Sequence, residues 1–141
     1  MADDPIIAVL EDDSQRTTAM RAVLAEAFPG YRHEFFPTAP GMIGFLKENL
    51  GAIRLLSLDH DLGPVVEHGG PNSGTGMDVA RFLARRDPVC HVILHSSHLP
   101  SVQRMEEELG EAGWNCSRVT AGAGTEWVAT GWRAEVERCL R

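Results

Sequence analysis

Short apolar segments of four or five residues alternate along the chain with longer segments in which apolar residues recur every three or four positions. A short apolar run is typical of a strand buried on both faces, whereas the longer recurrence predicts an amphipathic helix. We expect a helix after each strand, the last beginning near Glu126, and strands at residues 6–10, 33–36, 55–58, 91–94 and 115–119. The pattern therefore predicts five consecutive strand–helix units.

Polar residues mark the expected starts of three of these helices. Asp13 or Ser14 can cap the first helix, and Thr38 can cap the second. Thr75 and Asp78 have the spacing of a capping box at the start of the third helix. These residues place the helix boundaries directly after the first two strands and after a loop that follows the third.

Alternating strands and helices favour an open parallel sheet with helices on both faces and right-handed crossovers. The first, third and fourth strands are apolar, whereas the second and fifth are more polar and suit the edges of the sheet. This predicts an α/β flavodoxin-like fold, with a five-stranded parallel sheet in the order 2-1-3-4-5. We expect residues 1–141 to form a single domain, with its ligand beyond the carboxyl ends of the strands.

Composition and charge narrow the functional classes. The formal net charge of −7 disfavours general nucleic-acid binding, because contacts with phosphates dominate that affinity. No apolar run is long enough to cross a bilayer, and the first residues lack the features of a signal peptide. The three cysteines are widely spaced and odd in number, which favours a reduced, cytoplasmic setting.

Acidic residues follow two strands that are neighbours in the predicted sheet. Glu11 and Asp12 follow the first strand, and Asp59 and Asp61 follow the third. Two unit charges 4 Å apart repel by about 4 kcal/mol at an effective dielectric of about 20, so clustered carboxylates must bind protons or a cation. Oxygen ligands favour Mg²⁺, with Mn²⁺ as an alternative. We therefore expect these four acids to form a divalent-metal site, although each one alone could simply be a solvated strand end.

Further candidate residues lie at the same edge of the sheet. Ser96 follows the fourth strand, and its hydroxyl could donate to a phosphoryl oxygen. Asp59 is a candidate nucleophile or metal ligand, and His60 or His95 a candidate acid–base group. The alternative for His95 is a hydrogen-bonding residue at a strand end. The predicted catalytic set is Asp59, His60, His95 and Ser96.

These residues resemble those of the response-regulator receiver superfamily. The resemblance implies that Glu11 and Asp12 are metal-binding acids, that Asp59 is the phosphoacceptor and that Ser96 is the hydroxyl residue that follows the fourth strand. Receivers carry a lysine after the fifth strand, but the lysine of this chain, Lys47, lies on the second predicted helix. Arg118 stands near the required place, but arginine is bulkier and forked, so the exchange is not conservative.

Three motifs, in order along the chain, give a closer resemblance to the cyclic-phosphate-processing receiver domains. They are SLDHDLG at 57–63, TGMDV at 75–79 and VILHSSH at 92–98. This resemblance implies that the protein handles cyclic nucleotides or cyclic phosphate ends, as a sensor or as an enzyme. An enzyme of this kind would be a metal-dependent phosphoester hydrolase.

Two other functions remain open at this point. The domain could be a phosphoacceptor or pseudo-receiver signalling module that binds a protein partner. It could also be a TOPRIM-like nuclease domain, since Glu11 and the pair Asp59 and Asp61 have the required types. Asp12, where that fold expects glycine, argues against the nuclease. The expected ligand is a small phosphorylated molecule or a cyclic nucleotide, without a membrane partner.

Overall fold

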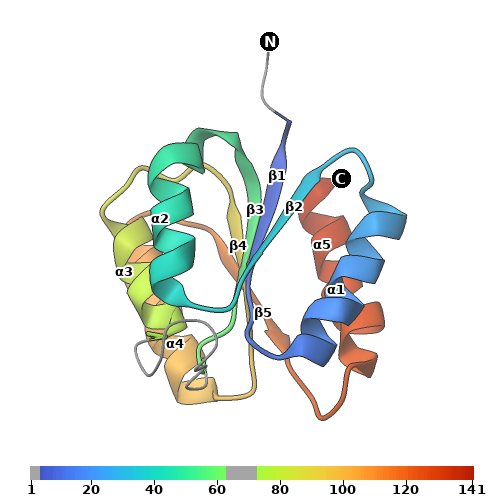
Figure 1. The fold of residues 1–141 in the computed structure, drawn as a ribbon. Coiled ribbons are helices and arrows are strands. Elements are labelled where there is room, and N and C mark those ends of the chain that lie inside the picture. Colours follow the sequence, from blue (N-terminus) through green and yellow to red (C-terminus); the bar gives the residue numbers. More distant parts are fainter. Residues whose placement is uncertain (1–3, 63–72) are drawn as a thin grey trace.

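A five-stranded parallel sheet forms the centre of the computed structural model, which describes residues 4–62 and 73–141 (Figure 1). The strand order is β2-β1-β3-β4-β5, which confirms the predicted flavodoxin-like arrangement. All five predicted strands are present within two residues of their expected bounds. They are β1 (Ile6–Leu10), β2 (Arg32–Phe36), β3 (Ile53–Leu58), β4 (His91–Ser96) and β5 (Cys116–Thr120).

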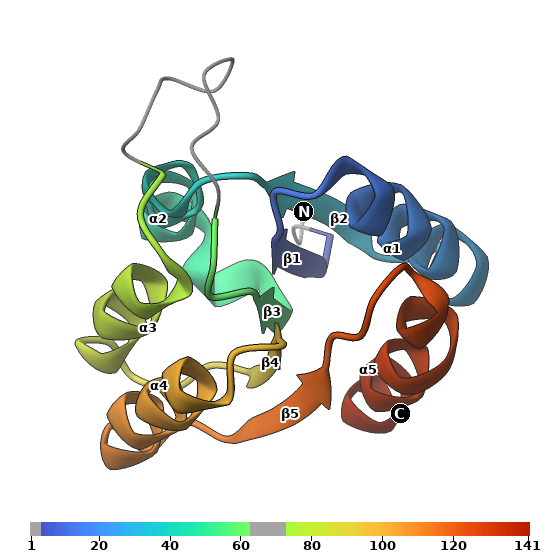
Figure 2. The same cartoon turned by 90° about the horizontal axis from the view of Figure 1, so that it is seen from below.

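Helices cover both faces of the sheet. Figure 2 shows α1 and α5 on one face and α2, α3 and α4 on the other. Short turns η1 (Leu50–Ala52) and η3 (Val128–Trp132) precede β3 and α5, and η3 is a π-helical turn. The helices are α1 (Ser14–Ala27), α2 (Ala39–Asn49), α3 (Gly76–Ala84), α4 (Leu99–Glu111) and α5 (Arg133–Leu140).

The expected caps begin three of these helices. The side chain of Asp13 accepts the N–H of Arg16 at 2.9 Å at the start of α1. Thr38 caps α2, and Thr75 begins α3 in a capping box in which its N–H donates to Asp78 at 2.9 Å. Each cap accepts or supplies bonds that the first turn of a helix cannot make internally.

The core lies in two layers, one on each side of the sheet. β1 is buried along its whole length, with Ile6, Ala8 and Leu10 facing α2, α3 and α4. Ile7 and Val9 face the opposite layer, which α1 and α5 cover. Burial on both faces explains why this strand reads as a continuous apolar run rather than as an alternating one.

The register of the sheet brings the ends of β1 and β3 together. Leu10 pairs with Leu58, and the N–H of Asp59 donates to the carbonyl of Leu10 at 3.1 Å. The start of α3 packs on the same segment, because a Cβ atom on Gly76 would lie 2.0 Å from the carbonyl oxygen of Asp59. The glycine of the TGMDV motif therefore permits α3 to begin against the end of β3.

Two sequence expectations concern the segment after β3. The loop expected over residues 63–74 lies mostly outside the described residues. The glycine that ends the SLDHDLG motif also lies outside them. In the ranges 4–62 and 73–141, no helix is long and apolar enough to span a membrane.

Candidate functional site

Two buried carboxylates face one another at the carboxyl edge of the sheet. Glu11 follows β1 and is 2 % exposed, and Asp59 follows β3 and is 4 % exposed. With a ring nitrogen of His95, which lies on β4, they place ligand-type atoms within 4.8 Å of one another. This acidic cluster of Glu11, Asp59 and His95 is consistent with a metal site, and three neighbouring strands build it.

The pKa of Asp59 shows how unfavourable the bare cluster is. This pKa is raised from 3.8 to about 8, mainly by burial and then by the charges of Glu11 and Asp12. The N–H of His60, which donates to Asp59 at 2.8 Å, and the charge of Arg16 act in the opposite direction. A carboxyl with this pKa is ready to exchange its proton for a cation near neutral pH, so the donor set fits a divalent metal.

Arg16 supplies positive charge to the cluster. Its guanidinium nitrogen Nη1 lies 3.8 Å from Glu11 Oε1 and 3.9 Å from Asp59 Oδ2. The same guanidinium lies over the ring of Trp127, 5.4 Å from its centre. Sequence reasoning missed Arg16, although its position in the first turn after the acidic run was a usable signal.

His95 is part of a buried chain of hydrogen bonds. The indole N–H of Trp132 donates to Ser57 Oγ at 2.9 Å, and Ser57 Oγ lies 2.6 Å from His95 Nδ1. The other ring nitrogen, Nε2, lies 3.1 Å from Glu11 Oε1. Indole can only donate, so every group is satisfied when Ser57 donates to Nδ1 and Nε2–H donates to Glu11.

These hydrogen bonds enclose the ring of His95 within the protein. Its side chain is 0 % exposed, and both ring nitrogens are bonded within the protein. We therefore interpret His95 as a residue that orients Glu11. Its partners Ser57 and Trp132, on β3 and η3, could not be predicted from the sequence, because they come from distant segments.

The remaining predicted residues lie around the cluster rather than in it. Asp12 is partly buried and acts on Asp59 through its charge. Asp61 accepts from His60 Nδ1 at 2.7 Å, and its side chain is 68 % exposed. The structure thus brings Glu11 and Asp59 together with His95, and it turns Asp61 toward His60.

Ser96 is placed at the carboxyl end of β4, where it was expected. It is 3 % exposed, and its Oγ accepts the N–H of His98 at 3.2 Å. That bond uses a lone pair of the oxygen and leaves the hydroxyl proton for an acceptor such as a phosphoryl oxygen.

Arg118 does not take the place of the lysine found in receivers. It lies on β5, and its guanidinium binds Glu106 of α4 through Nε at 2.7 Å and Nη2 at 2.5 Å. The ion pair lies on the surface. Lys47 lies on α2. The positively charged side chain beside Asp59 is therefore that of Arg16, which lies on α1.

The fold is similar to those of solved response regulators. The phosphorylated cyanobacterial phytochrome response regulator RcpA gives a TM-score of 0.75 at 14% identity, with 98% of this chain and 95% of that one covered. The Mn²⁺-bound response regulator Rcp1 gives 0.68 at 15% identity, covering 96% and 95%. The CheX–CheY–BeF3–Mg²⁺ complex from Borrelia burgdorferi gives 0.66 at 11% identity, covering 96% and 86%. At these identities the likeness concerns the fold alone.

Sequence comparison places the chain within the receivers. No curated protein matches it significantly. The TOPRIM-like alternative finds no support in the receiver structures described above. A family model described as "Cyclic-phosphate processing Receiver domain" matches residues 7–111, which include the acidic cluster and all three sequence motifs. The chain therefore belongs to the cyclic-phosphate processing receiver domain family.

Proposed function

We propose that this receiver domain binds Mg²⁺ or Mn²⁺ at Glu11 and Asp59 and there binds and processes a phosphate group of a small ligand. The observation that carries the proposal is the buried Glu11–Asp59 pair, in which the pKa of Asp59 is raised to about 8. A charge-rich pair of this kind is unfavourable without a proton or a cation. The Mn²⁺ in the structure of Rcp1, a receiver of similar fold, also supports a metal.

The residues of the chain would share the work at this site. Glu11 and Asp59 hold the cation, and the charge of Asp12 strengthens its attraction. His95 keeps Glu11 oriented, a role that supporting residues commonly have beside metal ligands. When bound, the metal would polarise a phosphoryl oxygen and lower the pKa of a coordinated water molecule.

Other side chains are suited to the phosphate group. Ser96 retains a hydroxyl proton that can be donated to a phosphoryl oxygen. His60 is half-buried beside Asp59 and is a better acid–base candidate than the fully enclosed His95. Arg16 can add positive charge where negative charge develops.

We propose a cyclic phosphate as the substrate class, on the strength of the family description and of the three motifs. The reaction would be hydrolysis of a phosphoester, and a sensor would bind the same ligand without turnover. The test is to incubate the protein with Mg²⁺ or Mn²⁺ and a panel of 2′,3′-cyclic and 3′,5′-cyclic nucleotides. Product formation is followed by chromatography and binding by calorimetry.

The matched variants for this test are Asp59→Asn and Asp61→Asn. Both remove a carboxylate from the same segment, but only Asp59 belongs to the buried pair. We expect Asp59→Asn to abolish metal-dependent binding or turnover and Asp61→Asn to retain most of it. If no cyclic phosphate is bound or hydrolysed by the metal-loaded protein, the proposed substrate class is wrong.

A second candidate function is phosphorylation of Asp59, with a protein partner that reads the phosphorylated state. The position of Asp59 at the end of β3, close to Arg16, favours it, as does the similarity in fold to phosphorylated RcpA. Acetyl phosphate should then add a phosphoryl mass that Asp59→Asn loses. For either function we also propose a single domain and a cytoplasmic location, the latter in keeping with three cysteines that are free thiols.

A further inference from the structure

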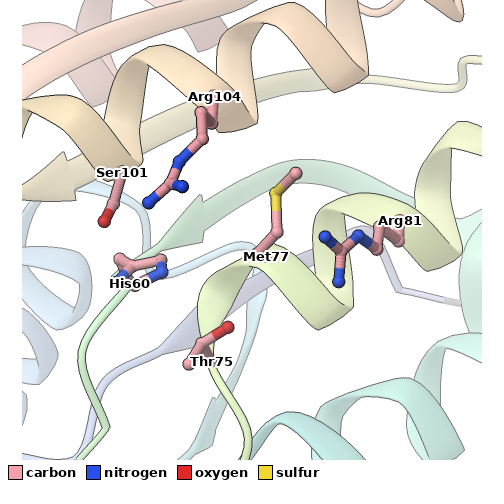
Figure 3. Close-up of a pocket in the computed structure, with 6 residues that line it drawn as sticks. All are labelled: His60, Thr75, Met77, Arg81, Ser101 and Arg104. Atoms are coloured by element: carbon pink, nitrogen blue, oxygen red, sulfur yellow. The ribbon is translucent and has the colours of Figure 1, made fainter.

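A polar cavity lies beside the acidic cluster, between α3 and α4. It has a volume of about 230 Å³, and Figure 3 shows its six lining side chains around one hollow. Ser101 and Arg104 come from α4, and His60 comes from the segment after β3. Thr75, Met77 and Arg81 come from α3 and its cap. We propose that this cavity, the arginine pocket, binds the phosphate group of a small ligand through Arg81 and Arg104 and without a metal ion.

The charges of the pocket carry the proposal. Arg81 and Arg104 project from two facing helices toward the same cavity (Figure 3). Although the chain has a net charge of −7, this cavity is lined by two guanidinium groups. Guanidinium groups bind phosphate in a bidentate geometry, and two of them can hold a single dianion.

Neither arginine forms an ion pair with a carboxylate in the part of the chain that the structure describes. Within residues 4–62 and 73–141, neither has a carboxylate within 4.0 Å of its guanidinium. Both residues are exposed. Many other arginines do form such pairs, namely Arg16, Arg32, Arg118, Arg133, Arg138 and Arg141. An anion entering the pocket therefore displaces no carboxylate of these described segments.

Other polar side chains complete the pocket. Ser101 is 2 % exposed, and its Oγ lies 2.5 Å from His98 Nδ1, which holds the hydroxyl in place. His60 is held through its Nδ1 by Asp61, and its ring stacks on that of His98 at 6.2 Å. Polar side chains held in place beside two guanidinium groups favour a compact anion rather than an extended acidic surface.

The volume of the cavity limits the ligand. Sites for drug-sized molecules typically enclose about 300–1,000 Å³. A cavity of about 230 Å³ accommodates a phosphate group and a small part of the molecule that carries it. The remainder of a nucleotide would have to lie outside the pocket.

The arginine pocket is adjacent to the acidic cluster but separate from it. The N–H of Gly76 donates to the carbonyl of His60 at 3.0 Å, so the start of α3 packs on the chain between the two sites. One site presents carboxylates for a cation, and the other presents guanidinium groups for an anion. The proposal thus goes beyond the proposed metal site and can be tested in its absence.

The test is an NMR titration of the full chain with inorganic phosphate in the presence of EDTA, near physiological ionic strength. We expect saturable shifts of the backbone signals at the starts of α3 and α4. Arg81→Gln and Arg104→Gln should each weaken binding by about tenfold, the loss expected for one charged hydrogen-bonding group. The double variant should show no saturable binding.

The matched control is Arg85→Gln, which removes an exposed arginine at the other end of α3. It changes the net charge equally and should leave the phosphate affinity unchanged. Thermal unfolding of all variants checks that they are folded, which we expect because the substituted side chains are exposed.

Parallel titrations with 5′-AMP and with 2′,3′-cyclic AMP distinguish the source of the phosphate. Tighter binding of either nucleotide than of inorganic phosphate would identify a phosphate ester as the ligand, and the reverse order would identify the free anion. The proposal is wrong if none of the three gives saturable shifts, or if the double variant binds as tightly as Arg85→Gln. Because EDTA is present, a failure of the proposed metal site does not affect this result.

Discussion

The ionisation of Asp59 affects stability and, in the proposed function, metal binding. Its pKa is raised to about 8 in the folded chain from the ordinary value of 3.8, mainly by burial. The folded state therefore binds this proton more tightly than the unfolded state. The stability that this provides is fully present below about pH 4 and is lost as the pH rises toward about 8.

We therefore predict that Asp59→Asn stabilises the metal-free protein at about pH 9, because the variant buries a neutral side chain. The expected rise in Tm is about 3 °C or more, corresponding to about 1 kcal/mol in a domain of this size. Thermal unfolding at several pH values measures it, with Asp61→Asn as the exposed control. A lower Tm for Asp59→Asn at high pH, with an unchanged pH dependence, would contradict the raised pKa.

Ser57 is the second residue with a sharply defined role, since it links Trp132 to His95. Ser57→Ala leaves the buried indole N–H without an acceptor and His95 Nδ1 without a donor. Each buried group left unpaired costs about 1–3 kcal/mol. We predict a loss of that order in the free energy of unfolding, measured by urea denaturation.

Ser97→Ala is the control for this prediction, because Ser97 is exposed and follows the end of β4. The control should stay within about 0.5 kcal/mol of the unsubstituted protein. If Ser57→Ala were equally stable, the proposed chain of hydrogen bonds would have no energetic role.

Among the elements, the start of α3 determines how Asp59 is presented. A Cβ atom at Gly76 would lie 2.0 Å from the carbonyl oxygen of Asp59, so Gly76→Ala must displace either the helix or the end of β3. We predict a destabilisation of about 2 kcal/mol or more, in the range of overpacking substitutions, together with weaker metal binding. Urea denaturation and metal titration of the same variant measure both effects.

Gly44→Ala is the matched control for Gly76→Ala. Gly44 lies inside α2, where a Cβ atom would meet nothing within 4 Å. The control should be more stable by about 0.5–1 kcal/mol, because alanine favours the helix. Equal effects of the two substitutions would show that contact with Asp59 is unimportant.

The elements themselves could largely be predicted from the sequence. Apolar runs indicated the strands, and Asp13, Thr38 and Thr75 indicated helix starts, because both signals are local. The π-helical turn η3 was not predicted, since a shift in the backbone hydrogen bonds leaves the pattern of apolar residues intact. That turn carries Trp132 into the core against Ser57.

For the whole molecule, the sheet topology was enough to bring Glu11 and Asp59 together, because parallel strands end at one edge. Side-chain partners from distant segments were harder to predict. Arg16 and Trp127, for example, meet near the cluster from α1 and from the segment before α5. The arginine pocket likewise depends on how α3 and α4 face one another, which neither helix encodes alone.

The domain as a whole should couple metal binding to pH. A cation must displace the proton of Asp59, so metal affinity should rise with pH until about pH 8 and then level off. Over that range we expect about a tenfold gain for each pH unit, the consequence of releasing one proton. Calorimetric titration with Mg²⁺ at several pH values measures this. A pH-independent affinity would indicate a site that does not involve Asp59.

The central claim is that Glu11 and Asp59 hold a divalent cation, and a Mn²⁺ titration followed by electron paramagnetic resonance tests it most directly. We predict saturable binding of Mn²⁺ to the unsubstituted protein and competition by Mg²⁺. Asp59→Asn should weaken the binding by about tenfold or more, the loss expected for one charged ligand, while Asp61→Asn changes it little. Absence of Mn²⁺ binding, or equal binding by the Asp59→Asn variant, would contradict the account.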